Sequence, residues 1–217
     1  MKLYIIRHGE TEWNTVKRMQ GQTDIPLNEN GINLAKEVGK YMKDIHFDYI
    51  ISSPLERAIT TAKLITEGRN IPFKTDYRLI EMSFGKWEGC RITDPNVVPP
   101  EFDKKFHEDP SNCMTPPGGE SFDDVLKRTK EFYDELCATP EYKDASILIS
   151  THGAAGRCLL ANFYEDKKDI WRGQIPPNCS VCIVEVKDGI GKVIEKDKMF
   201  NHAKLINNIV GRLKYIY

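Results

Sequence analysis

The stretch KLYIIRHGET, residues 2–11, indicates how this fold is built. Its apolar half predicts a buried strand, and Arg7 and His8 stand at the carboxyl end of that strand. A second stretch of the same form, SILISTHG at residues 146–153, places His152 directly after another apolar run. Because ligands of α/β sheets gather outside the carboxyl ends of the strands, we expect the two histidines to meet at one edge of a sheet.

Strand and helix patterns alternate along the 217 residues, which is typical of an α/β domain. A chain of this length can bury a full core, so we expect a single domain over residues 1–217. The predicted strands cover residues 3–6, 49–52, 73–75, 146–150, 179–186 and 190–198. The last two are expected to form a hairpin through Asp188 and Gly189.

The predicted helices begin at residues that commonly cap helices. One begins near Asn28, and its apolar positions recur at helical spacing. Another begins at SPLE, residues 53–56, where we expect Ser53 and Glu56 to form a capping box, with Arg57 in the first turn or just beyond. Further amphipathic or apolar helices are predicted over residues 122–136, 153–163 and 205–213.

The pattern weakens over residues 82–119, which are rich in proline. A short helix is predicted around residues 101–107, and we expect its Phe102 and Phe106 to anchor the segment to the core. Long irregular segments in compact domains are usually lids or binding loops. The sequence therefore predicts a lid insertion over one end of the sheet.

Composition limits the partners and the location. The formal net charge of -1 gives no sign of a nucleic-acid or anionic-membrane partner, and no apolar stretch approaches the roughly 20 residues of a membrane helix. A strand that starts at Leu3 leaves no room for a cleavable signal peptide, so we expect a cytoplasmic protein. Cys179 and Cys182 spell a redox or zinc half-motif, but residues three apart on a strand point to opposite faces. We expect buried, reduced thiols there.

The side chains expected at the sheet edge suit a dianion such as phosphate. Arg7 and Arg57 can each grip phosphate oxygens with paired donors, and His152 can add another donor. The helix starts at Pro54 and Gly153 can add backbone N–H groups.

His8 is the candidate nucleophile, with one ring nitrogen free to attack phosphorus and the other donating to a backbone carbonyl. Glu81 ends an apolar run, 79–80, and is also expected just past a strand end. It is the candidate general acid for the leaving group and then the base for the attacking water. Glu88 and Glu120 are rivals for that role. No metal is required beside such a cationic cage, and the chain lacks the closely spaced aspartates of a magnesium site.

These residues resemble the motifs of the histidine phosphatase superfamily, which includes the cofactor-dependent phosphoglycerate mutases. The matching segments occur in the family's order: RHGETEWN at 7–14, SSPLERA at 52–58, LIEMSFGKWEG at 79–89 and THG at 151–153. The resemblance implies a three-layer α/β/α sandwich with a mixed, mostly parallel sheet. It also implies a phosphohistidine at His8.

The same resemblance assigns phosphoryl-binding and catalytic roles to Arg7, Arg57 and His152, and it makes Asn14 and Gln20 further phosphate contacts. The segment after Glu81 resembles the phosphatase branch, because mutases carry an Arg-His-Tyr-Gly-like run there and a longer insertion.

We therefore expect a histidine acid phosphatase-type enzyme. It would be a metal-independent phosphomonoesterase that hydrolyses small phosphorylated metabolites and needs no cofactor. A cofactor-dependent phosphoglycerate mutase and a non-enzymatic module that binds phosphorylated ligands remain alternatives. The expected partner is a small-molecule phosphate ester, and the sequence leaves a homodimer open.

Overall fold

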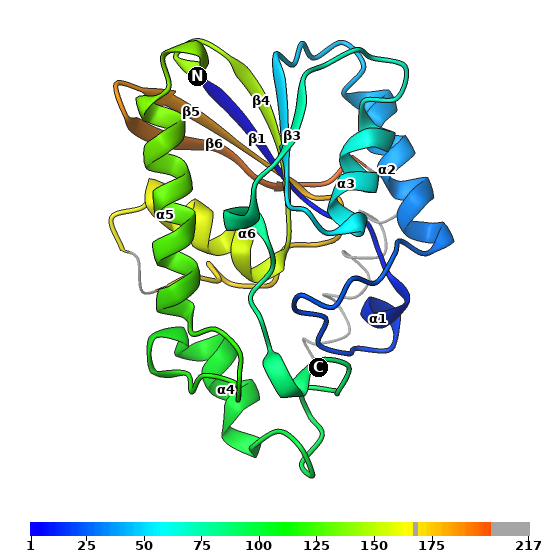
Figure 1. The fold of residues 1–217 in the computed structure, drawn as a ribbon, viewed down its shortest axis with the longest axis vertical. Coiled ribbons are helices and arrows are strands. Elements are labelled where there is room, and N and C mark those ends of the chain that lie inside the picture. Colours follow the sequence, from blue (N-terminus) through cyan, green and yellow to red (C-terminus); the bar gives the residue numbers. More distant parts are fainter. Residues whose placement is uncertain (167–168, 201–217) are drawn as a thin grey trace, which may run out of the picture.

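The computed structural model of this chain describes residues 1–166 and 169–200. In these ranges the strands form one six-stranded sheet in the order β3–β2–β4–β1–β5–β6 (Figure 1). The strands are β1 (Lys2–Arg7), β2 (Tyr49–Ser52), β3 (Phe73–Thr75), β4 (Ser146–Thr151), β5 (Val181–Lys187) and β6 (Ile190–Lys198). The first four are mutually parallel, whereas β5 runs antiparallel to β1 and to β6. The predicted mixed, mostly parallel sheet is confirmed.

Helices cover both faces of this sheet (Figure 1). On one face lie α2 (Glu29–Tyr41) and α3 (Glu56–Ile65), and on the other lie α5 (Phe122–Ala138) and α6 (Gly153–Leu160). This is the three-layer arrangement that the sequence predicts.

The central strand β1 shows why two helical layers form. Leu3 and Ile5 belong to the hydrophobic cluster under α5 and α6, while Tyr4 and Ile6 belong to the cluster under α2 and α3. Successive side chains of a strand point to opposite faces, so an uninterrupted apolar run needs cover on both sides.

The register of the three central strands fixes the position of the site. Arg7, the last residue of β1, is level with Thr151, the last residue of β4. Ser52, at the end of β2, is level with Ser150 of β4. The residues that leave these strands therefore gather at the same edge of the sheet: His8, Ser53 and His152.

Residues 82–119 form short elements that lie beside the start of α5 (Figure 1). The longest is α4 (Pro100–Glu108), which confirms the predicted short helix. Its Phe102 and Phe106 are 0% and 4% exposed in a cluster that includes Trp171, so these rings anchor the segment as expected. The remaining helical segments are α1 (Glu12–Thr15) and the 3-10 turns Tyr77–Leu79, Gly85–Trp87, Pro110–Asn112, Pro140–Tyr142 and Ala161–Phe163.

The predicted capping box at Ser53 is wrong. Helix α3 begins at Glu56, its N-cap is Leu55, and that residue makes no side-chain capping bond. The first N–H group of the helix, that of Glu56, donates instead to the carboxylate of Asp24, 2.9 Å away. The Ser53 hydroxyl lies 2.7 Å from a ring nitrogen of His152, so a tertiary contact takes the side chain that the local pattern assigns to the helix.

Two predicted strand boundaries also differ. Glu81 does not follow a strand, because the apolar residues before it form the 3-10 turn Tyr77–Leu79. Strand β5 begins two residues later than predicted, since Cys179 adopts a left-handed backbone with φ 58°. The predicted turn at Asp188 and Gly189 is confirmed, and both residues have the positive φ values that a tight hairpin turn requires.

The cysteine prediction is confirmed. Cys179 and Cys182 are buried and not joined in a disulfide, and they belong to hydrophobic clusters on opposite faces of the sheet. The described helices include none that is both long and apolar enough to cross a membrane. The amphipathic segment predicted at residues 205–213 lies outside the described residues.

Candidate active site

A cavity of about 250 Å³ opens at the edge of the sheet where β1 and β4 end. Seven of the eight residues predicted for the site line it; the eighth, His152, has its ring centroid 5.1 Å from that of His8. The seven are Arg7, His8, Asn14, Gln20, Arg57, Glu81 and Gly153. Apolar side chains form much of the remaining wall: Met19, Phe84, Ile92, Phe106, Trp171 and Ile175.

The His8 ring is held in one orientation. Its Nδ1 lies 2.6 Å from the carbonyl oxygen of Gly9. A carbonyl can only accept, so Nδ1 carries the proton and Nε2 has a free lone pair. Within the described residues no hydrogen bond engages Nε2. Burial, followed by the charges of Arg57 and Arg7, holds the pKa of His8 well below its usual value, so the ring stays neutral.

Arg7 offers an unused donor to the cavity. Its side chain is fully buried, and one terminal nitrogen donates to the carbonyl of Pro176. Its Nε is one of two buried side-chain nitrogens in the described residues that have no hydrogen-bond partner. Burial lowers the pKa of Arg7 to about 10, which still leaves the group charged at neutral pH. A charged donor without a partner is costly, and an anion bound here removes that cost.

Arg57 is aimed by backbone carbonyls. Its two terminal nitrogens donate to the carbonyl oxygens of Thr23 at 2.8 Å and Gly21 at 2.6 Å. Its Nε donates to Nδ1 of His152, 3.3 Å away. Three directed bonds fix the plane of the guanidinium group beside both histidines.

The loop that aims Arg57 is itself organised by Glu88. The Glu88 carboxylate accepts the backbone N–H groups of Gln22 at 2.9 Å and Thr23 at 2.8 Å. Gly21 has a left-handed backbone, with φ 54°, and a Cβ there would lie 2.0 Å from a Glu88 oxygen. Glycine at position 21 is therefore what lets the carboxylate reach the loop.

His152 is also neutral, with its proton on the other nitrogen. Because Nδ1 accepts from Arg57, Nε2 must be the donor to the Ser53 hydroxyl. Burial, and then the charge of Arg57, holds the pKa of His152 well below its usual value. The two histidines thus present opposite tautomers within one cage of buried cations.

Glu81 occupies the amino end of α6. Its carboxylate accepts backbone N–H groups from Gly153 at 2.9 Å, Ala154 at 3.3 Å and Ala155 at 2.9 Å, and from its own neighbour Met82 at 2.9 Å. Glu81 engages the backbone donors of the Gly153 helix start, so the expected contact of that helix start with phosphate stays a prediction. The Pro54 helix start is likewise occupied, by Asp24.

Asn14 and Gln20 are drawn together through Thr11. The Thr11 backbone N–H donates to the amide oxygen of Asn14 at 3.1 Å, and its hydroxyl donates to the amide oxygen of Gln20 at 2.9 Å. Both amides line the cavity close to His8. Their roles toward phosphate stay predictions.

Sequence reasoning missed three residues that shape the site: Asp24, Ser53 as the partner of His152, and Glu88 as the organiser of the Arg57 loop. Each acts across a long sequence separation, which no local pattern reveals. Only Glu88 carried a usable signal, because it lies in the same short run as Glu81. In the described ranges no group of three or more His, Cys, Asp or Glu side chains is placed to hold a metal ion.

Comparison with known proteins gives a consistent result. The model of the family described as "Histidine phosphatase superfamily (branch 1)" matches residues 3–196. A protein of Proteus mirabilis named probable phosphoglycerate mutase GpmB is 31% identical over 188 residues, which cover 87% of this chain and 86% of that protein. Phosphoserine phosphatase 1 of Hydrogenobacter thermophilus is 37% identical over 159 residues, covering 73% of this chain and 74% of its own.

The solved structure of Bacillus stearothermophilus YhfR superposes with a TM-score of 0.84 at 32% identity. The match covers 92% of this chain and 99% of that one.

Proposed function

The chain belongs to the histidine phosphatase superfamily, branch 1, and from this premise we propose that it is a metal-independent phosphomonoesterase acting through a phosphohistidine at His8. One observation carries the proposal. The neutral Nε2 of His8 has no hydrogen-bond partner among the described residues, and His8 lines the same cavity as Arg7, whose buried charged Nε also lacks one. A nucleophile beside an unsatisfied cation is the arrangement that phosphoryl transfer to the enzyme needs.

In the first half of the reaction, His8 Nε2 attacks phosphorus and the bond from phosphorus to the ester oxygen breaks. Arg7 and Arg57 neutralise charge on the equatorial oxygens, and the ring of His152 lies 5.1 Å from that of His8. The leaving oxygen takes a proton from Glu81, so that an alcohol departs rather than an alkoxide.

In the second half, a water attacks the phosphohistidine and gives its proton to Glu81, while the bond from phosphorus to Nε2 breaks and inorganic phosphate forms. All four backbone contacts of the Glu81 carboxylate use it as an acceptor, which suits this step. In the first step the carboxyl group must carry the proton instead.

The size and lining of the cavity support a small substrate. About 250 Å³ is slightly smaller than the roughly 300–1,000 Å³ of typical small-molecule pockets, so it suits the phosphate and a compact leaving group. Phe84, Ile92 and Phe106 come from residues 82–119 and form part of its wall. We propose that this segment acts as a lid and selects the alcohol.

The test is turnover of p-nitrophenyl phosphate by the wild type and by His8→Ala, in the presence of a chelator. We expect the substitution to reduce kcat to the uncatalysed background and to abolish the labelled phosphoenzyme that acid quenching traps in the wild type. Equal rates for the two proteins would show that His8 is not the nucleophile. Phosphate binding without a trapped phosphoenzyme would support the non-enzymatic binding module.

A phosphoglycerate mutase is the second candidate, because a relative of similar length carries that name. It predicts that 2,3-bisphosphoglycerate primes the enzyme and that phosphoglycerate isomerisation is much faster than ester hydrolysis. An isomerisation assay run beside the hydrolysis assay decides between the two.

A further inference from the structure

The segment that carries Glu81 lies outside the sheet. Residues 78–83 have no strand partner, yet the carboxylate of Glu81 must stay in register with His8, which leaves a central strand. Two fixed points come from the sheet side: the Thr151 hydroxyl donates to the carbonyl of Leu79 at 2.8 Å, and α6 binds the Glu81 carboxylate. These contacts leave the two ends of the segment to be held from elsewhere.

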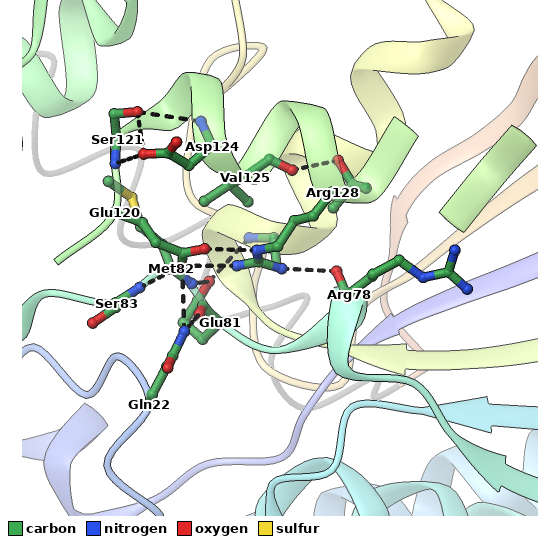
Figure 2. Close-up of polar contacts among 12 residues, drawn as sticks. Gln22, Arg78, Glu81, Met82, Ser83, Glu120, Ser121, Asp124, Val125 and Arg128 are labelled. Atoms are coloured by element: carbon green, nitrogen blue, oxygen red, sulfur yellow. Dashed lines mark hydrogen bonds and ion pairs between the residues drawn. The ribbon is translucent and has the colours of Figure 1, made fainter. Parts of the chain in front are cut away.

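Arg128 of α5 holds one end directly. One terminal nitrogen of its guanidinium group donates to the backbone carbonyl of Arg78 at 2.7 Å (Figure 2). The same group makes a forked ion pair with Glu120, at 2.9 Å from Nε and 3.1 Å from the second terminal nitrogen. The side chains of the pair are only 14% and 23% exposed, so solvent screens this contact less than a surface ion pair.

Glu120 holds the other end. Its Oε2, which accepts from the second terminal nitrogen of Arg128, also accepts the backbone N–H of Ser83 at 2.9 Å (Figure 2). The backbone N–H of Glu120 donates to the carbonyl of Ser83 at 2.9 Å. Gln22 then bridges the carboxylate of Glu120, at 3.3 Å, and the carbonyl of Glu81, at 3.2 Å. The ion pair therefore grips the backbone on both sides of Glu81.

The pair is mounted on a rigid support. Helix α5 begins at a complete capping box, in which Ser121 and Asp124 exchange backbone and side-chain bonds. Glu120 directly precedes this cap, and Arg128 lies two turns further along the same helix. A motion of the Glu81 segment would have to break a forked ion pair or displace a packed helix.

We propose that Arg128 and Glu120 are positioning residues for Glu81: together they clamp residues 78–83 and fix the carboxyl group at the distance from which it exchanges a proton with the leaving oxygen. The inference rests on the proposed function, because it assigns Glu81 the role of general acid. It gives the ion pair a part in one chemical step, protonation of the leaving group, and none in the attack by His8.

The test compares two substrates that differ in their need for an acid. Phenyl phosphate releases a phenol with a pKa of about 10, like that of tyrosine, and needs protonation, whereas p-nitrophenyl phosphate releases a far more acidic phenol. We measure kcat/KM, which covers the steps through the first bond cleavage, for both substrates. The variants are Arg128→Met, Glu120→Gln and Glu81→Gln.

We expect Arg128→Met to lower kcat/KM for phenyl phosphate about tenfold more than for p-nitrophenyl phosphate, a part of the about 10²–10⁴-fold that general acid–base catalysis contributes. Arg128→Lys keeps the charge but not the fork and should fall between the wild type and Arg128→Met. The readout is the ratio of kcat/KM for p-nitrophenyl phosphate to kcat/KM for phenyl phosphate. Glu120→Gln keeps the shape of the side chain and should raise this ratio by less than Arg128→Met does. If Arg128→Met does not fold, Glu120→Gln carries the same test.

Arg69→Met is the matched control. Its half-buried guanidinium group also donates to backbone carbonyls, those of Met42 and Ile45, but it lies over the ring of Phe47 in the cluster under α2 and α3, away from residues 78–83. A general loss of packing lowers both substrates equally, so this control should leave the ratio unchanged.

The double variant Glu81→Gln with Arg128→Met separates the inference from its premise. We expect the double variant to have the same substrate ratio of kcat/KM as Glu81→Gln alone. Once the acid is gone, loss of the clamp has no acid left to displace. If Glu81→Gln itself leaves the ratio unchanged, the proposed acid is wrong. If Glu81→Gln raises the ratio and Arg128→Met and Glu120→Gln do not, the clamp is wrong and the proposed function stands.

Discussion

The two halves of the site are held in different ways. The cationic half consists of groups that leave the ends of β1, β2 and β4, so the hydrogen-bonded register of the sheet sets the spacing of His8, Ser53 and His152. The acid half, Glu81, stands on an irregular segment that side chains from α5 and backbone donors from α6 hold in place. A strand ladder fixes position cooperatively, whereas a side-chain clamp depends on each member.

The difference has a consequence for substitutions. Changes to His8, Arg7 and Arg57, the groups of the cationic half that address the phosphoryl centre, should remove most of the catalysis, whereas changes to a support such as Ser53 should have smaller effects. Changes around Glu81 should be graded and should depend on the leaving group. The following predictions test how far the two halves are separate.

The largest effect in the cationic half after loss of His8 should come from Arg57→Lys. A lysine keeps the charge but cannot bond Gly21, Thr23 and His152 at once, so its ammonium is free to move away from the phosphate. We expect kcat/KM to fall by about 10²-fold or more, as for loss of one donor to a developing anion. Steady-state kinetics with p-nitrophenyl phosphate measure this. A loss smaller than about fivefold would mean that charge alone suffices.

Glu88→Gln should break the separation between the halves, because Glu88 belongs to the segment that follows Glu81 yet organises the loop that aims Arg57. A glutamine places an NH₂ group against N–H donors of Gln22 or Thr23, and leaves at least one of them unsatisfied. We expect about tenfold weaker inhibition by inorganic phosphate and a free energy of unfolding lower by about 1–3 kcal/mol.

The readout for Glu88→Gln is the ratio of the two substrates described above. Since its effect passes through Arg57, both phosphate esters should lose kcat/KM equally. A selective loss of phenyl phosphate turnover would place Glu88 with Glu81 instead, as the rival acid that the sequence left open.

The sequence revealed the cationic half well for a physical reason. Uninterrupted apolar runs that end in polar residues indicate buried strands and where they end, and parallel pairing brings such ends to one edge of the sheet. Arg7, His8 and His152 are thus predictable from short stretches alone. Their gathering in one cavity needed only that β1 and β4 be neighbours, as they are.

The support of the acid half was hidden because it is non-local. Glu120 and Arg128 are eight residues apart, but Arg128 and the carbonyl of Arg78 are separated by 50 residues, and Gln22 and Glu120 by 98. The local rule even misled at Ser53, where serine before proline matches a helix cap. The hydroxyl accepts the N–H of Leu55 at 3.3 Å, and its shorter contact, at 2.7 Å, is with the buried His152 ring.

Ser53→Ala tests the contact between Ser53 and His152, and its expected effect on kcat is smaller than that of Arg57→Lys. Removal of the hydroxyl leaves the buried Nε2 of His152 without its acceptor, which should lower the free energy of unfolding by about 1–3 kcal/mol. We expect kcat to fall severalfold as the ring loses its orientation. Ser52→Ala is the matched control, because its buried hydroxyl bonds only the neighbouring carbonyl of Ser53 at 2.8 Å. If the control lowers kcat by the same factor, the contact with His152 has no special role.

The last expected effect is on stability alone: a pH dependence of the free energy of unfolding that arises in the cationic half. Burial, and then Arg57, lowers the pKa of both His8 and His152 in the folded protein, whereas an unfolded histidine has a pKa of about 6.5. Below pH of about 6.5 the unfolded chain therefore binds protons that the folded chain refuses, so acid favours unfolding. Each histidine should lower the free energy of unfolding by about 1.4 kcal/mol per pH unit between about pH 6 and 5, and neither should change it above about pH 7.

Chemical denaturation of the wild type and of His8→Gln at pH 5, 6 and 7 measures this slope. The variant keeps one of the two neutral rings, so the contribution of the pair should fall by half, while stability above about pH 7 reports only the change in packing. Carboxylates with lowered pKa, such as Asp76 beside Arg78, lose their contribution only at lower pH and do not enter this window. An unchanged slope in His8→Gln would mean that His8 takes up a proton in the folded protein. The buried cations would then not hold its ring neutral, contrary to the lowered pKa on which its role as nucleophile depends.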